Sequence, residues 1–214
     1  MVKAMLFDFW GTVVETGVRP SPLKQVKFFL RDKREYGDFV EQFEQVFMTK
    51  SYANLNDAFK ESVEALGLRI PEFVYDKLIG MWNKNSLLAR PFPDAVEALT
   101  ALQAAGIKLF LVTNSDQFSV PAVVDKFGLE KYFTNVYYSF QGGKLKTDKT
   151  MIAAILKEHK LAAKDVLFVG DSIDSDMRAA TEAGIPGVLV DRRDTREYEP
   201  KITSLLALVD WKNE

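Results

Sequence analysis

The sequence predicts an α/β fold, a Rossmann-like parallel sheet with helices on both faces and an inserted helical cap subdomain. An apolar run from Ala4 to Phe7 has the length of a short buried strand. From residue 89 onward, short apolar runs alternate with helical periodicity, which is the pattern of a parallel sheet with crossover helices. Residues 24–88 show helical periodicity without a strand pattern, so we expect an insertion after the first strand.

The first strand places Asp8 at its carboxyl end, and Gly11 permits a sharp turn soon afterwards. A polar break containing glycine and proline follows, and apolar residues then recur at helical spacing. We expect these apolar residues to form the core of the insertion rather than a ligand site. They are Phe39, Phe43, Val46, Phe47, Phe59, Val63, Leu66, Val74, Leu78 and Met81.

The second part of the chain supplies the remaining strands and helices of the predicted sheet domain. Strands are expected at residues 107–112, 136–140, 166–169 and 187–190. Helices are expected before Gly106, after Pro121, after Asp148, from Asp174 to Ala183 and around Leu205 to Val209. We therefore predict a catalytic core domain of residues 1–16 and 89–214 and a helical cap domain of residues 17–88.

The amino-acid composition excludes several kinds of catalytic site, metal site and partner. The chain has no cysteine, and His159 is its only histidine, which excludes thiolate sites, a histidine-based triad and a multi-histidine metal centre within one chain. The net charge of -2 gives no indication of nucleic-acid binding. No apolar run is long enough to cross a bilayer, and no signal-peptide pattern is present, so we expect a cytoplasmic protein without a membrane partner. The oligomeric state is left open.

Polar residues follow several of the predicted strands. Asp8, Thr113, Asn114 and Asp171 each stand at or just beyond a strand end, and these ends share one edge of a parallel sheet. Asp8 and Asp171 would repel each other there unless a cation lay between them. Carboxylate oxygens suit Mg²⁺, and Asp176 follows at the start of a helix, where it would join or support the site.

The same edge is predicted to bind a dianion. Lys146 precedes a helix and would contribute a cation, while Thr113 offers a hydroxyl group and Asn114 a backbone N–H. With Mg²⁺, these groups would neutralise and hold a phosphoryl group close to Asp8. Phosphoryl transfer to a carboxylate is the reaction that needs this set of groups.

Four segments together resemble the motifs of the haloacid dehalogenase superfamily in order and spacing. They are Asp8 to Thr12 (DxDGT in its phosphatases), Thr113-Asn114, Lys146 to Asp148 (commonly KPD) and Gly170 to Asp176 (GDSxxxD). The resemblance spans nearly the whole predicted core, and the helical insertion lies where this family places its cap. It implies that Asp8 is the nucleophile and that Thr113 and Lys146 hold the transferring group. The implied metal-binding residues are Asp8, Asp171, Asp176 and Trp10 through its backbone carbonyl, and the implied substrate contacts are Thr12, Trp10 and Asn114.

Trp10 departs from the phosphatase motif. The family's phosphatases carry Asp at this position, which protonates the leaving oxygen and then activates water, and an indole does neither. The 2-haloacid dehalogenases of the superfamily carry an aromatic residue here, use no metal and displace halide. They usually lack the metal-binding Asp at the position of Asp171, which is present in this chain.

We give Asp171 more weight than Trp10, because a cluster of carboxylates is costly without a cation. The leading prediction is a Mg²⁺-dependent phosphatase that acts on a small phosphate ester or anhydride through an aspartyl-phosphate on Asp8. Without the usual acid, aryl or acyl phosphates should be preferred unless another group donates the proton. Glu15 is the nearest acid, although a solvated Glu15 is the simpler interpretation. The alternatives are a metal-independent 2-haloacid dehalogenase with Asp8 as nucleophile and a non-catalytic member that retains ligand binding.

Overall fold

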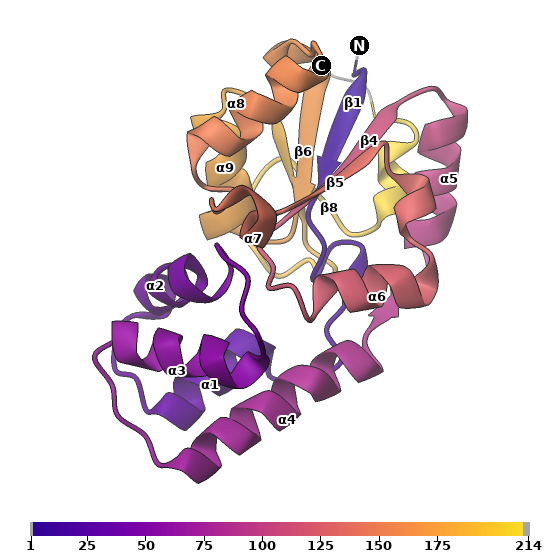
Figure 1. The fold of residues 1–214 in the computed structure, drawn as a ribbon. Helices are drawn as coiled ribbons and strands as arrows, with labels where there is room; N and C mark the ends of the chain where they lie inside the picture. The colour runs from indigo at the N-terminus through magenta and orange to yellow at the C-terminus, as the bar shows by residue number, and fades with distance from the viewer. Residues whose placement is uncertain (1, 212–214) are drawn as a thin grey trace.

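The computed structural model describes residues 2–211. Within them, six parallel strands form one sheet in the order β5-β4-β1-β6-β7-β8, so the N-terminal strand lies inside the sheet (Figure 1). The strands are β1 (Ala4–Phe7), β4 (Lys108–Thr113), β5 (Asn135–Tyr138), β6 (Val166–Gly170), β7 (Gly187–Val190) and β8 (Lys201–Ile202). All four residues of β1 are buried, as its uninterrupted apolar sequence predicts for a strand covered on both faces.

The register of the central strands brings their carboxyl ends to one level. Phe7 of β1 pairs with Leu111 of β4 and with Val169 of β6. The backbone continues this pairing beyond β1, since Asp8 N–H donates to the Val169 carbonyl at 2.9 Å. The residues that follow these three strands therefore meet at one edge of the sheet.

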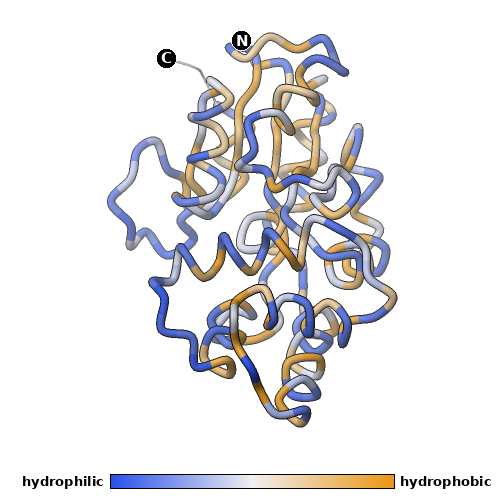
Figure 2. Tube along the Cα trace, turned by 60° about the vertical axis from the view of Figure 1, so that its left-hand side comes forward, coloured by the Kyte–Doolittle hydropathy of each residue, from blue (hydrophilic) through white to orange (hydrophobic). Residues whose placement is uncertain are grey.

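Helices cover both faces of the sheet, and side chains alternate between two hydrophobic clusters along the strands. Met5 and Phe7 belong to the cluster under α5 (Ala95–Ala104), α6 (Val120–Phe127) and η4 (Leu205–Leu208). Ala4 and Leu6 belong to the cluster under α8 (Lys149–Glu158) and α9 (Arg178–Glu182). This alternation is the period of a strand, and the tube through the sheet has hydrophobic colours in Figure 2. The predicted fold class is confirmed.

The inserted helices form a separate hydrophobic cluster. They are α1 (Pro22–Leu30), α2 (Tyr36–Phe47), α3 (Leu55–Ala65) and α4 (Glu72–Leu88), and they lie below the sheet in Figure 1. Their shared core is aromatic: Phe43 stacks on Phe47 with ring centroids 4.8 Å apart, and Trp82 meets Phe47 edge-on at 5.0 Å. The predicted apolar stripes thus supply the core of the insertion, which we call the cap. The boundaries of the two predicted domains stay a prediction.

A short antiparallel pair joins the cap to the sheet domain. The chain enters the cap after β2 (Val14–Glu15) and returns through β3 (Arg90–Pro91), and Val14 pairs with Pro91. Each strand has two residues, which is too short for an alternating pattern to be recognised in sequence. We call this pair the hinge ribbon.

Three predicted elements differ from those observed. The strand expected over 136–140 ends at Tyr138 and turns into a short helix, α7 (Ser139–Gly142). The helix expected from Asp174 to Ala183 begins as a π-helical turn, η3 (Ile173–Met177), and continues as α9. The last helix is 3-10 in geometry, and short 3-10 turns also occur at η1 (Glu130–Tyr132) and η2 (Ala163–Asp165). In the described part of the chain, every helix is too short or too polar to cross a membrane.

Candidate active site

Three carboxylates from two strand ends lie close together at the carboxyl edge of the sheet. Asp8 follows β1, while Asp171 and Asp176 follow β6, and one oxygen from each of the three lies within 4.8 Å of the others. Asp8 and Asp176 are buried, with 5% and 0% of their surface exposed. The π-helical turn contributes to this geometry, because it brings the Asp176 carboxylate to accept a hydrogen bond from the Ser172 backbone N–H at 2.9 Å.

Two glycines allow the carboxylates to approach the backbone. Gly11 has φ +79°, and a Cβ atom there would lie 2.2 Å from Oδ2 of Asp171. A Cβ atom on Gly170 would lie 2.2 Å from the Asp176 carboxyl carbon. Any side chain at either position would therefore displace a member of the cluster.

Gly11→Ala should disable the protein and lower its melting temperature by about 5–10 °C, since it adds left-handed strain and a clash with Asp171. Thermal unfolding and an activity assay check both effects. Gly80→Ala is the matched control, because Gly80 lies inside α4 with nothing near its missing Cβ, and alanine is the better helix former there by roughly 1 kcal/mol. Equal melting temperatures for Gly11→Ala and the wild type would contradict the tight approach of Asp171.

Lys146 is the cation of the cluster. Its Nζ lies 2.5 Å from Oδ1 of Asp8 and 2.6 Å from Oδ1 of Asp176, and the residue is 5% exposed. Burial by itself would lower the pKa of Lys146, but the charges of Asp176 and Asp8 raise it above the usual lysine value. Lys146 therefore stays charged and links the nucleophile predicted at Asp8 to the second carboxylate of the last motif.

The raised pKa values of Asp8 and Asp171 show that Lys146 does not fully neutralise the carboxylate cluster. Burial, followed by repulsion from Asp176, raises the pKa of Asp8 to about 6. Burial, followed by repulsion from Asp8 and Asp176, raises the pKa of Asp171 to about 8, although Lys146 and Arg196 oppose the change. A divalent cation would relieve this repulsion and meet oxygen ligands, so the donor set fits a hard metal ion.

Asn114 connects the cluster to the cap. Its Oδ1 accepts from the Lys146 backbone N–H at 2.8 Å, and its Nδ2 donates to Oε2 of Glu44 at 2.7 Å. The sequence predicts that Asn114 contributes its backbone N–H, whereas both of these contacts are made by its side chain. Thr113, also expected in the site, is 1% exposed at the end of β4, and its hydroxyl lies 3.3 Å from the Asn114 carbonyl.

The contacts described for Thr12 and Trp10 of the first motif, and for Glu15 just beyond it, lie outside the carboxylate cluster. Thr12 is fully buried; its carbonyl accepts from Nη2 of Arg192 at 2.6 Å, and its hydroxyl has no hydrogen-bond partner among residues 2–211. Trp10 is half-buried, and its ring meets Phe9 edge-on with centroids 4.9 Å apart. Glu15 lies on the hinge ribbon, with 44% of its side chain exposed, and pairs with Arg19.

Glu44 is the residue that sequence reasoning missed. It projects from α2 of the cap, where its neighbour Phe43 is buried in the aromatic core. Burial raises the pKa of Glu44 to about 7. The available signal was its position beside the apolar stripe of a cap helix, but that spacing does not say which part of the sheet domain the residue meets.

The cap is docked on the sheet domain through several direct contacts. Trp82 Nε1 donates to Oδ2 of Asp116 at 3.0 Å, and the Ser139 hydroxyl donates to the Met48 carbonyl at 2.5 Å. The Tyr52 backbone N–H donates to Gln117 Oε1 at 2.9 Å. These contacts and the link between Asn114 and Glu44 close the cap over the carboxylate edge.

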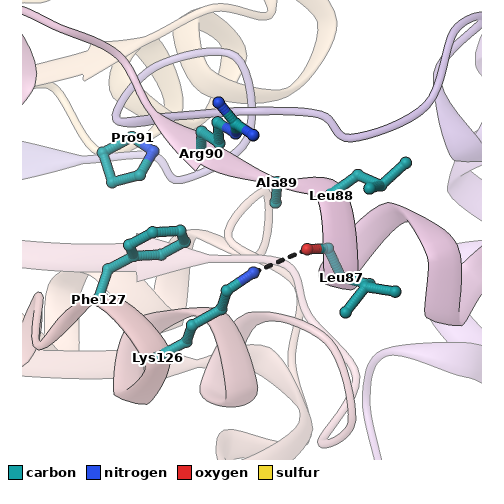
Figure 3. Close-up of a pocket in the computed structure, with 7 residues that line it drawn as sticks. All are labelled: Leu87, Leu88, Ala89, Arg90, Pro91, Lys126 and Phe127. Carbon is teal, nitrogen blue, oxygen red and sulfur yellow. Dashed lines mark hydrogen bonds between the residues drawn. The ribbon is translucent and has the colours of Figure 1, made fainter.

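A hollow of about 560 Å³ lies beside the hinge ribbon (Figure 3), and none of the three carboxylates lines it. Lys126 of α6 reaches across it and donates to the Leu87 carbonyl at 2.7 Å, which satisfies a carbonyl at the end of α4. The hollow lies where the cap joins the sheet domain, and it is not part of the carboxylate site. Its lining residues are Leu87, Leu88, Ala89, Arg90, Pro91, Lys126 and Phe127.

Comparison with known proteins identifies the class. The sequence model of the haloacid dehalogenase-like hydrolases matches residues 2–184, and the chain belongs to this family of hydrolases. A "Glyceraldehyde 3-phosphate phosphatase" of Methanocaldococcus jannaschii is 28% identical, over 98% of this chain and 96% of that protein. An "Enolase-phosphatase E1" of Xylella fastidiosa is 26% identical, over 91% of this chain and 88% of that protein.

Solved structures of the same architecture include both chemistries of the family. The L-2-haloacid dehalogenase of Xanthobacter autotrophicus has a TM-score of 0.64 at 19% identity, covering 98% of this chain and 97% of its own. A HAD phosphatase from Thermococcus onnurineus has a TM-score of 0.63 at 21% identity, covering 97% of this chain and 96% of its own. At these identities the likeness establishes the fold, and the site must distinguish the chemistry.

Proposed function

We propose that this hydrolase is a Mg²⁺-dependent phosphatase that acts on a small phosphate ester or anhydride through an aspartyl-phosphate on Asp8. The observation that carries the proposal is the cluster in which Asp8 and Asp171 lie together while Lys146 bridges Asp8 to Asp176. The phosphatase names of the two relatives matched over nearly their whole length support the same reaction.

In the proposed reaction, an oxygen of Asp8 attacks phosphorus and the bond from phosphorus to the leaving oxygen breaks. Lys146, with Thr113 at the end of β4, holds the transferring group against Asp8. Water then attacks phosphorus, the bond to Asp8 breaks, and phosphate leaves with the carboxylate restored. Mg²⁺ would be held by Asp8, Asp171 and the Trp10 carbonyl, with Asp176 in support, and would supply charge neutralisation.

Asp171 favours this reaction over dehalogenation. An anionic 2-haloacid bound at Asp8 would lie close to the carboxyl group of Asp171, which belongs to the same 4.8 Å cluster. With Mg²⁺ bound, the same carboxylates instead form part of a site that attracts a phosphate dianion. Trp10 is compatible with phosphoryl transfer, because the metal ligand expected from that position is its main-chain carbonyl.

Phosphatase activity should depend fully on the metal. We expect hydrolysis of p-nitrophenyl phosphate with Mg²⁺, its loss on chelation with EDTA, and its return when Mg²⁺ is restored, because unneutralised carboxylates repel the substrate dianion. The same preparations are assayed for halide release from 2-chloropropionate. Halide release that persists in EDTA, without phosphatase activity, would instead establish the dehalogenase reaction; tight ligand binding without turnover of either substrate would indicate a non-catalytic member.

A further inference from the structure

The proposed phosphatase reaction needs a proton donor that position 10 does not provide. Trp10 carries an indole, which does not exchange protons near neutral pH, and its ring packs against Phe9. Breaking an alkyl phosphate ester without protonating the leaving oxygen would release an alkoxide, which is a poor leaving group. A second acid near Asp8 would remove this difficulty.

Three acids outside the carboxylate cluster are held by contacts of their own. Asp116 accepts from Trp82 Nε1 and from the Ser119 hydroxyl and backbone N–H. Asp191 accepts from two backbone N–H groups in the loop that follows β7. Glu15 pairs with Arg19 on the hinge ribbon.

Glu44 reaches the site from the opposite side, on the cap. Asn114 Nδ2 donates to its Oε2 at 2.7 Å, the Lys146 backbone N–H donates to Asn114 Oδ1 at 2.8 Å, and Lys146 Nζ lies 2.5 Å from Asp8. Three successive contacts therefore connect Glu44 with the predicted nucleophile.

The surroundings of Glu44 suit a group that changes protonation state during turnover. Burial raises its pKa to about 7, Lys146 and the Asn114 hydrogen bond oppose the rise, and the charges of Asp8 and Asp176 add to it. Tyr36, eight residues or about two helical turns earlier on α2, also interacts electrostatically with Glu44. A carboxyl group with a pKa near the working pH serves both as acid and as base.

We propose that Glu44 is the general acid–base of this active site and is delivered by closure of the cap; the inference rests on the proposed phosphatase function. In the first step, Asp8 forms its bond to phosphorus, the ester bond breaks, and the Glu44 carboxyl proton moves to the leaving oxygen. In the second step, water attacks the aspartyl-phosphate and gives its proton to the Glu44 carboxylate. The sum is ester plus water giving alcohol plus phosphate, with Glu44 and Asp8 returned to their starting states.

The test compares Glu44→Gln with Glu64→Gln, a matched control on an exposed position of cap helix α3. Glyceraldehyde 3-phosphate has an alkyl leaving group that needs protonation, whereas p-nitrophenyl phosphate has a leaving group that departs without it. Glu44→Gln should lower kcat on the alkyl phosphate by ~10²–10⁴-fold with little change in KM. On p-nitrophenyl phosphate it should give a burst of one nitrophenol per enzyme followed by slow turnover, because only the water step still needs the base.

Intact-mass measurement should find the phosphorylated chain accumulating in Glu44→Gln with p-nitrophenyl phosphate, while Glu64→Gln behaves as wild type. Unchanged kcat on both substrates in Glu44→Gln, or a change confined to KM, would overturn the role of Glu44 while leaving the phosphatase function standing. A wild-type protein inactive on both substrates would instead refute the phosphatase function itself.

A measurement on the wild type covers the case in which Glu44→Gln does not fold. If Glu44 is the acid, kcat/KM for the alkyl phosphate should fall as pH rises through about 7. The value for p-nitrophenyl phosphate should not show that fall. Coincident pH profiles for the two substrates would overturn the assignment.

Discussion

Asp8→Asn is expected to reduce phosphatase activity by on the order of 10⁴-fold or more, because an amide oxygen at this position does not form the aspartyl-phosphate. The substitution is nearly isosteric, and Lys146 keeps its second partner, Asp176. Steady-state assays with p-nitrophenyl phosphate in Mg²⁺ measure the loss. Intact mass should show no phosphoryl group on the variant.

The melting temperature of Asp8→Asn distinguishes loss of the nucleophile from loss of the folded structure. In the metal-free protein, burial and repulsion from Asp176 raise the pKa of Asp8, so its charge destabilises the folded state at neutral pH. Asp8→Asn removes that charge and should melt no lower than the wild type in EDTA. An inactive variant that melts well below the wild type would report lost structure instead, and a variant that keeps its activity would show that Asp8 is not the nucleophile.

The metal-free protein should lose stability as pH rises from about 4 to above 8, and Mg²⁺ should reverse that loss. The folded-state pKa values of Asp8, about 6, and Asp171, about 8, lie above the usual aspartate value of 3.8. The folded chain thus binds more protons than the unfolded chain in this interval, so its stability is greatest at the acid end and declines with pH. Glu44 adds to the decline because burial raises its pKa in the same direction.

Melting temperatures measured across this pH range, in EDTA and in Mg²⁺, test the effect. We expect Mg²⁺ to raise the melting temperature most at pH 8, by on the order of 5 °C, because the ion binds the ionised carboxylates of the folded chain. Asp171→Asn should flatten the decline in EDTA and remove most of the Mg²⁺ effect, whereas Asp76→Asn, on the exposed side of α4, should do neither. A Mg²⁺ effect that persists in Asp171→Asn would place the metal elsewhere.

The sequence predicts the sheet and its polar edge well, for a physical reason. Each central strand is an apolar run that ends at a polar residue, and parallel strands bring their ends together without any knowledge of loop geometry. Asp8 and Asp171 could therefore be placed side by side. Lys144 and Lys149 lie close to Lys146 in the sequence, so spacing alone does not distinguish the three lysines; in the structure it is Lys146 that contacts both Asp8 and Asp176.

The position of Glu44 in the site and the hinge ribbon could not be predicted from the sequence in this way. The apolar stripe of α2 shows which face is buried in the cap, but the orientation of the cap depends on long-range contacts such as that between Trp82 and Asp116. The strands of the hinge ribbon are stabilised by their pairing with each other rather than by a pattern within either. The π-helical turn at η3 depends in the same way on Asp176 folding back over Ser172.

The hydrogen bond between Asn114 and Glu44 has a consequence for how this architecture diversifies. The proposed nucleophile, Asp8, follows a strand of the sheet, whereas the proposed acid–base, Glu44, belongs to a cap attached through the two strands of the hinge ribbon. A swap of that cap between relatives would then transplant reactivity toward different leaving groups along with selectivity for the rest of the substrate. Under the proposed role of Glu44, the inserted cap supplies the acid–base group that the first motif lacks at Trp10.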